Sequence, residues 1–147
     1  MIIGILLFMI FLSVILALGE IQIEGKDGWA SNLPCWRIET EFAKKLMDGN
    51  PITGYHVYTA LAILSFSHLP LLFITWTWRL ECLLLGFYFG VILLEDIFWF
   101  VFNPYYGLRS FRKGKIWWRK TWWGPLPSFT WVYLTLTVIL FTSGNIA

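Results

Sequence analysis

The sequence predicts an all-α fold: a membrane-embedded four-helix bundle with a short cytoplasmic amphipathic helix and a Trp-rich basic loop at the lipid interface. Two features of composition carry this prediction. Hydrophobic residues make up 58% of the 147-residue chain and charged residues only 14%, whereas a typical soluble domain has about 25% charged residues. The chain also contains ten Trp, a residue that collects where bilayer hydrocarbon meets the headgroups. The length fits one integral membrane domain, residues 1–147.

Four apolar stretches reach or approach the length of about 20 residues that a helix needs to cross a bilayer. They cover about residues 2–23, 55–76, 80–102 and 129–142. None shows the apolar/polar alternation of a barrel strand. The first stretch lacks the positive start of a signal peptide and is longer than its usual apolar core, so we expect a retained helix.

Lys and Arg are distributed unequally among the connections. Four lie between the first and second stretches, six between the third and fourth, and Arg79 alone between the second and third. Because Lys and Arg mark the cytoplasmic side, we expect a multi-pass protein of the cell membrane. Both long loops should be cytoplasmic and both termini outside.

The first long loop contains the segment CWRIETEFAKKLMDG, residues 35–49. Ile38, Phe42 and Leu46 are spaced four residues apart, which places them on one face of a helix. Pro34 suits a first helical turn, and Gly49 suits a helix end. The pattern predicts a short amphipathic helix that lies on the cytoplasmic membrane surface.

The second long loop, residues 107–127, alternates basic and aromatic residues. Phosphate contacts and base stacking would make it a nucleic-acid site. Between two spans, the pattern better fits indoles at the interface and basic side chains on anionic lipid headgroups. We therefore expect the lipid bilayer, and no nucleic acid, as the partner of this loop. The interfacial residues would be Arg112, Lys113, Lys115, Trp117, Trp118, Trp122 and Trp123.

Acidic residues inside the apolar stretches define a candidate functional site. Glu95 and Asp96 interrupt the otherwise apolar run VILLEDIFWFVF, and ionisable residues in such runs usually face the bundle interior. In an antiparallel bundle the end of the first span, the start of the second and the end of the third lie at one level. The topology therefore predicts a polar intramembrane cluster of Glu20, Glu24, His56, Glu95 and Asp96.

Carboxylates with one imidazole suit a hard or borderline divalent metal ion. The candidate ligands are Glu20, His56 and Glu95, with a divalent metal ion as the expected cofactor. The alternative is an ion-pair network with Arg109 or Arg112 that fixes the register of the helices. Asp96 is rotated about 100° from its neighbour on the helix, so it should contact the fourth span or the basic loop.

Known catalytic motifs such as HExxH, GxSxG and the Gly-rich phosphate loop are absent from the sequence, so no catalytic residue is assigned. Two main function classes remain open. The first is an interaction or accessory subunit of a membrane complex, with other membrane subunits as partners. The second is a metal-binding protein or metal-dependent enzyme with its carboxylate/His site at the cytoplasmic leaflet. An ion or proton transporter is a third, lesser option.

Several short segments resemble uncharacterised small prokaryotic four-span membrane proteins. They are EDIFWF at residues 95–100, NPYYG at 103–107, GYH at 54–56 and the Trp-rich segment 116–123. The resemblance extends over most of the chain, from residue 20 to 131. It implies a compact four-span unit, and it implies neither an activity nor any site residue.

Overall fold

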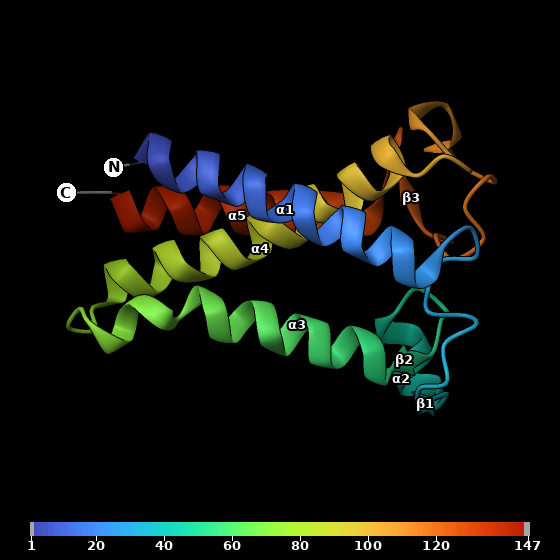
Figure 1. Ribbon diagram of the computed structural model, residues 1–147, viewed down its shortest axis with the longest axis horizontal. Coiled ribbons are helices and arrows are strands. Elements are labelled where there is room, and N and C mark those ends of the chain that lie inside the picture. The colour runs from blue at the N-terminus through green and yellow to red at the C-terminus, as the bar shows by residue number, and fades with distance from the viewer. Residues whose placement is uncertain (1, 146–147) are drawn as a thin grey trace.

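The computed structural model describes residues 2–145, and it is mostly helical with a few short strands (Figure 1). Its body consists of α1 (Ile2–Glu24), α3 (Gly54–Ser67), α4 (Trp78–Phe102) and α5 (Ser128–Asn145). The connections contain α2 (Glu41–Leu46) and the 3-10 turns η1 (Leu69–Leu72) and η2 (Leu108–Ser110). Strand β1 (Arg37–Ile38) pairs antiparallel with β2 (Ile52–Thr53), and β3 (Trp122–Trp123) with β4 (Leu126–Pro127).

Of the helices in the described range, α1 and α4 are each long and apolar enough to cross a membrane. The second predicted span is divided instead. Its helix, α3, is 14 residues long. The chain continues as η1, and Pro70 lies near the start of this 3-10 turn. Proline has no N–H to donate to the preceding helical turn, and this explains why regular α-helix ends at Ser67.

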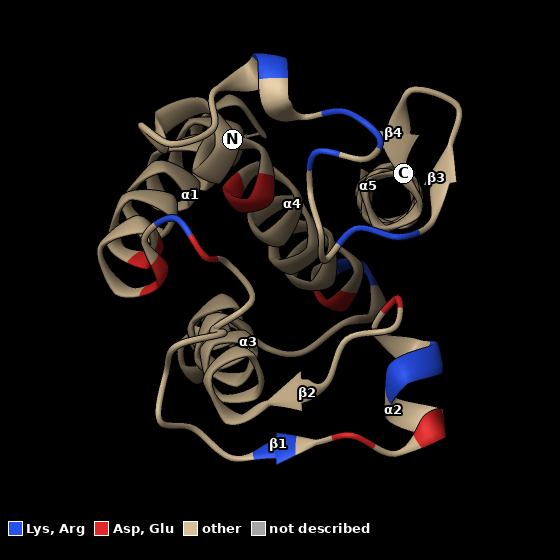
Figure 2. Cartoon of the chain, turned by 90° about the vertical axis from the view of Figure 1, so that its right-hand side faces the viewer, with Lys and Arg blue, Asp and Glu red and all other residues tan. Residues whose placement is uncertain are grey.

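Helix α4 is central, with α1 and α5 packed along it and α3 in looser contact (Figures 1 and 2). Small residues allow this close packing. A Cβ added at Gly90 would collide with the Met9 sulfur of α1, and one at Gly86 would lie 3.3 Å from Phe141 of α5. Ser13 of α1 also donates a hydrogen bond to the Val91 carbonyl of α4 at 3.1 Å. Close packing therefore joins α1, α4 and α5.

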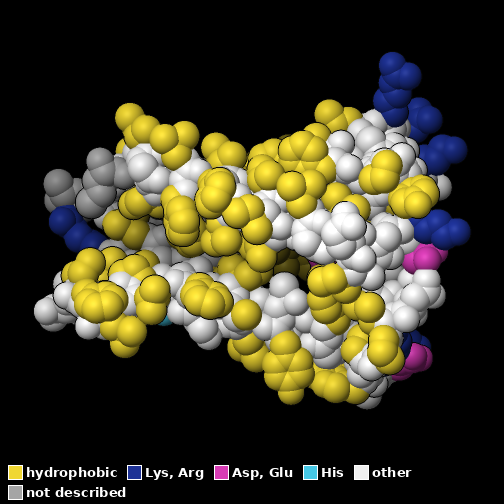
Figure 3. All heavy atoms as spheres, in the orientation of Figure 1, with side chains coloured by type: hydrophobic (Ala, Val, Ile, Leu, Met, Phe, Trp, Pro, Cys, Tyr) yellow, Lys and Arg dark blue, Asp and Glu magenta, His cyan; other side chains and the backbone are white. Residues whose placement is uncertain are grey.

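The two long connections, residues 25–53 and 103–127, lie at the same end of the molecule, and the start of α1 and the end of α5 lie at the other (Figure 1). All Lys and Arg except Arg79 belong to these connections, so positive charge gathers at the loop end, as Figure 3 shows. Hydrophobic side chains cover much of the surface along the helices in the same view.

The predicted amphipathic helix is shorter than expected. Ile38 lies in β1, and α2 begins at Glu41, where Thr40 caps it by accepting a 3.2 Å hydrogen bond from the Ala43 amide. The prediction that Ile38 shares this helix with Phe42 and Leu46 was wrong, because Ile38 pairs with Ile52 in a short ladder. Phe42 is 76% exposed, so the helix still presents an apolar surface.

Candidate functional site

A cavity of about 530 Å³ opens between α1, α3 and α4 near the loop end. Phe129 and Tyr133 of α5, together with Trp118 and Arg119 of the second long loop, complete its wall. Three helices thus bring polar residues to one level, as an antiparallel arrangement requires. The cavity is lined by every member of the predicted polar cluster: Glu20, Glu24, His56, Glu95 and Asp96.

The closest grouping within the cavity joins two carboxylates and one imidazole. Glu20 and Glu24 lie one turn apart on α1 and share a face of the helix, and His56 lies in the first turn of α3. One ligand atom from each residue lies within 4.8 Å of the other two. Glu24 Oε1 lies 3.6 Å from His56 Nε2. The structure therefore brings Glu20 and His56 together with Glu24 rather than Glu95.

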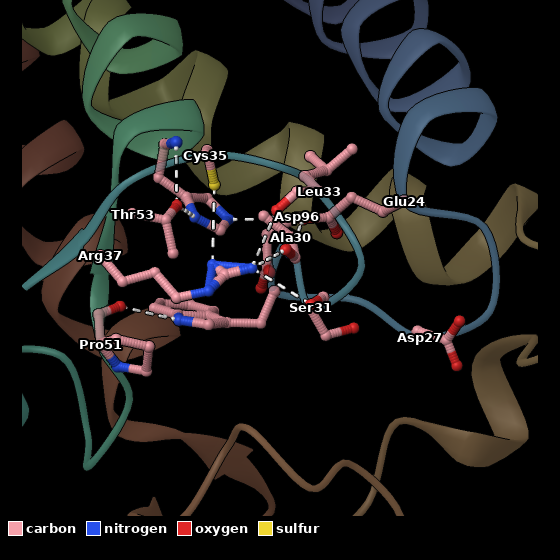
Figure 4. Close-up of polar contacts among 12 residues, drawn as sticks. Glu24, Asp27, Ala30, Ser31, Leu33, Cys35, Arg37, Pro51, Thr53 and Asp96 are labelled. Atoms are coloured by element: carbon pink, nitrogen blue, oxygen red, sulfur yellow. Dashed lines mark hydrogen bonds and ion pairs between the residues drawn. The ribbon is translucent and has the colours of Figure 1, made fainter. Parts of the chain in front are cut away.

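The His56 ring is held in place by the residue that begins its helix. The Thr53 hydroxyl accepts a hydrogen bond from the His56 backbone N–H at 3.3 Å and lies 2.6 Å from His56 Nδ1 (Figure 4). The indole of Trp29 packs against the ring, with 4.6 Å between centroids. With Nδ1 engaged, Nε2 is the nitrogen that faces Glu24. Metal sites commonly fix an imidazole through its other nitrogen in this way.

The Glu24 side chain is 5% exposed and holds the loop that follows α1. Its Oε1 accepts a hydrogen bond from the Ala30 amide. Arg37 closes the same turn by donating from Nη2 to the carbonyls of Ala30, Ser31 and Leu33, at 2.5–3.2 Å (Figure 4). Trp29 and Ala30 both have positive φ, 50° and 49°. Residues other than glycine rarely adopt this backbone conformation. The contacts of Glu24 and Arg37 hold this turn.

Asp96 pairs with the guanidinium of Arg119, as expected for a residue that faces the basic loop. The ion-pair alternative named Arg109 or Arg112, and among the residues lining the cavity the guanidinium belongs instead to Arg119. The reason is that the segment around Ile116 and Trp118 folds back and packs against α1 and α4, which carries the following residue into the cavity. No sequence pattern distinguished Arg119 from its basic neighbours.

Glu95 contributes a buried atom without a partner. Its Oε1 has no hydrogen-bond partner among the described residues, and the same holds for Trp99 Nε1 and Arg119 Nε. All three residues line the cavity. The carboxylates near Glu95 are those of Glu20, Asp96 and Glu24, and Glu95 also shares a side-chain hydrogen bond with Glu20. Unpaired buried polar groups are costly and call for a ligand, an ion or water.

The charges around the cavity do not balance. Its lining contains four carboxylates and one guanidinium, and that guanidinium is already paired with Asp96. Removing like charges from water together is unfavourable unless some of the carboxyl groups are protonated or a cation is present. A cation held by Glu20, Glu24 and His56 would relieve this repulsion, and Glu95 lines the same cavity.

The connection formed by residues 103–127 also binds the chain that follows α1. Asn103 Nδ2 donates to the Gly25 carbonyl at 2.9 Å, Tyr106 donates to the Lys26 carbonyl at 2.8 Å, and Trp117 Nε1 donates to the Asp27 carbonyl at 2.9 Å. Burial and then the charges of Asp27 and Glu24 raise the pKa of Tyr106. The two long connections are thus joined at the loop end by contacts between residues far apart in the sequence.

The predicted lipid-interface residues divide into two groups. Arg112, Lys113, Lys115, Trp117 and Trp123 are exposed, and Trp122 is half-buried. Trp118 is only 4% exposed and packs in the core with Trp99 and Phe100, so its side chain does not face the surface. Trp117 and Trp118 are adjacent, and only one of two neighbouring side chains can point inward here. The i, i+2 spacing of Ile116 and Trp118, which are both buried, was the feature of the sequence that could have indicated this.

A scan of the chain against models of protein families, a search of curated proteins and a search of solved structures found no match. Function must therefore follow from the chemistry of the cavity.

Proposed function

We propose that this protein is a four-span protein of the cell membrane that holds a divalent metal ion in the cavity between α1, α3 and α4. Its long loops lie in the cytoplasm, its termini lie outside, and the site is reached near the cytoplasmic leaflet. Glu20, Glu24 and His56 are the proposed ligands, and Glu95 is the fourth. The protein is then a membrane-embedded metal-binding protein. It is a metal-dependent enzyme if one coordination position of the ion is left open for a substrate.

The membrane assignment is supported by the apolar length of α1 and α4 and by the ten-to-one division of Lys and Arg between the two ends. Helix α5 has 18 residues. Helix α3 is shorter, but η1 and the residues after it continue in the same direction (Figure 1). All four segments then cross the bilayer, with the Trp-rich loop at the cytoplasmic interface and its exposed basic residues on anionic headgroups.

One observation carries the metal assignment: ligand atoms of Glu20, Glu24 and His56 lie within 4.8 Å of one another beside the unpartnered Glu95 Oε1. A structural ion-pair network would need a basic side chain among these acids. The guanidinium that lines the cavity is instead paired with Asp96. Carboxylate oxygens with one imidazole nitrogen suit Mg²⁺, Mn²⁺ or Zn²⁺.

Metal content tests the proposal directly. The full chain, purified in detergent and incubated with Mg²⁺, Mn²⁺ or Zn²⁺ before removal of the excess, should retain about one ion per chain in elemental analysis, since one set of ligands is present. Glu24→Gln and Glu95→Gln should each lose most of it. Glu41→Gln is the matched control, because the Glu41 side chain is 95% exposed and belongs to α2.

The outcome that rejects the metal site is equally concrete. The proposal is rejected if the natural protein retains none of the three ions above background. It is also rejected if Glu24→Gln, Glu95→Gln and Glu41→Gln retain equal amounts of metal. Circular dichroism of each variant separates a lost ligand from a lost fold, because a misfolded variant also loses helical signal.

A second candidate function is an interaction or accessory subunit of a membrane complex. The observation that favours it is the cluster of large exposed apolar residues on β1 and α2 and just before them, namely Trp36, Ile38, Phe42 and Leu46. Native gel electrophoresis of mildly solubilised membranes would report a complex much larger than the 17.2 kDa chain, and Phe42→Ser should release the chain from it. Migration as the free chain in both cases would reject this function.

A further inference from the structure

An apolar groove of about 770 Å³ runs between α1 and α3. Leu12 and Leu16 of α1 form one side, and Tyr58, Ala62 and Phe66 of α3 form the other. Figure 3 shows the surface hollowed between these helices, with hydrophobic side chains on both borders. In a bilayer this groove faces lipid, and its size is in the usual range of about 300–1,000 Å³ for ligand sites.

The groove adjoins the polar cavity. Leu16, Ile23, Tyr55, Thr59 and Ile63 line both spaces. The two spaces are thus neighbours: the groove is apolar along α1, α3 and loop residues 33–36, and the cavity beside it carries the charged side chains. That distribution matches an amphiphile, with its hydrocarbon chain in the groove and its headgroup in the cavity.

The unpaired atoms of the cavity indicate the headgroup. Trp99 is 4% exposed and Arg119 has a side chain 9% exposed, and each leaves a buried N–H without a partner among the described residues. Both groups are hydrogen-bond donors, and the proposed divalent ion adds a positive charge that attracts anions. An anionic group with several oxygens can accept from such donors and bind such an ion, and phosphate has this chemistry.

We propose that the protein binds a lipid with a phosphate-bearing headgroup, which enters sideways from the bilayer between α1 and α3. Its chain occupies the apolar groove, and its phosphate meets Trp99, Arg119 and the metal ion. This inference rests on the proposed metal site and names the ligand class of that site. Because four carboxylates surround the headgroup, phosphate binding requires the ion.

Native mass spectrometry of the full chain in detergent tests the inference, since each peak reports bound metal and bound lipid separately. The probes are dioleoyl phosphatidic acid and dioleoylglycerol, which share their chains and differ in the phosphate. We expect phosphatidic acid to bind about tenfold more tightly, the effect of about one charge-assisted hydrogen bond. Chelation of the metal should abolish this preference.

Two substitutions on α3 separate groove binding from adhesion to the basic loops. Ala62→Trp fills the groove and should weaken phosphatidic acid binding about tenfold or more, by loss of buried chain surface, with the metal retained. Leu61→Trp is the matched control, because Leu61 is exposed and lies outside the groove lining. Trp99→Phe removes one donor, so it should weaken binding of phosphatidic acid and leave that of dioleoylglycerol unchanged.

Equal binding by the Ala62→Trp and Leu61→Trp variants would overturn the groove, and equal binding of the two lipids would overturn the headgroup assignment. Phosphatidic acid binding that is sensitive to Ala62→Trp in a protein without metal would overturn the metal site and its requirement for lipid, and would support the groove alone. Metal retention with no lipid bound would support the metal site and overturn the lipid inference.

Discussion

The Thr53 hydroxyl serves His56 twice: it accepts from the backbone N–H at 3.3 Å and lies 2.6 Å from the ring Nδ1. One side chain therefore begins α3 and orients a proposed metal ligand. The two roles are separable by experiment, because other helices in this chain begin with a threonine that has no histidine to hold.

Thr53→Val should lower metal affinity about 10- to 100-fold, the usual effect of removing a group that orients a ligand, and should cost about 1 kcal/mol of stability as a lost helix cap. Thr77→Val is the control, since Thr77 caps α4 by accepting from Leu80 at 3.1 Å and does not line the cavity. Metal titration should separate the variants, although their thermal stabilities should be similar. Equal metal affinities would show that Thr53 acts only as a cap.

Arg119→Met should destabilise the protein by about 3 kcal/mol, because it leaves Asp96 as a largely buried carboxylate without its cation. The double variant Asp96→Asn/Arg119→Met should recover part of this loss, since no lone charge remains. Thermal unfolding in detergent measures both. Arg112→Met, on the exposed part of the same loop, should leave the midpoint unchanged. A double variant less stable than the single one would contradict a charge-pair role.

Gly90→Ala should cost about 1–3 kcal/mol through overpacking, because a Cβ there meets the Met9 sulfur of α1. Adding Met9→Ala should restore part of the stability by making room. Gly4→Ala is the control, since nothing lies within 4 Å of its added Cβ, and alanine should stabilise that helix by about 0.5–1 kcal/mol. Thermal unfolding of the four proteins decides, and a Gly90→Ala variant as stable as Gly4→Ala would contradict the close α1–α4 packing.

Membrane topology can be tested by labelling single cysteines after Cys35 and Cys82 are replaced by serine. An impermeant thiol reagent added to intact cells should label Asn145→Cys and leave Lys113→Cys unlabelled until the cells are opened. Both positions are exposed in the structure. Labelling of both from the same side would reject the proposed four-span arrangement with the long loops inside.

The sequence was sufficient to predict α1, α4, α5 and the start of α3, and the level at which polar groups meet, because these follow from apolar length and antiparallel order. It did not predict that the second apolar stretch divides before Pro70. Glu20, His56 and Glu95 reach one cavity for that reason. The burial of Trp118 and the entry of Arg119 were not predictable, since they depend on how residues 116–122 fold back onto α1 and α4. Ile38 was misassigned because its pairing partner, Ile52, lies beyond any local periodicity.

The strained turn after α1 connects the cavity to the first long loop. Glu24 Oε1 accepts from the Ala30 amide, and the same oxygen faces His56 Nε2 at 3.6 Å. A metal ion bound as proposed between that oxygen and the imidazole would withdraw electron density from the hydrogen bond that the Ala30 amide donates. Occupancy of the proposed site and the conformation of this turn would then be thermodynamically linked, and by reciprocity a partner that reshapes the turn would change the affinity for the ion. In the proposed topology, the loop face of the protein would thereby sense, or set, the state of a site within the bilayer.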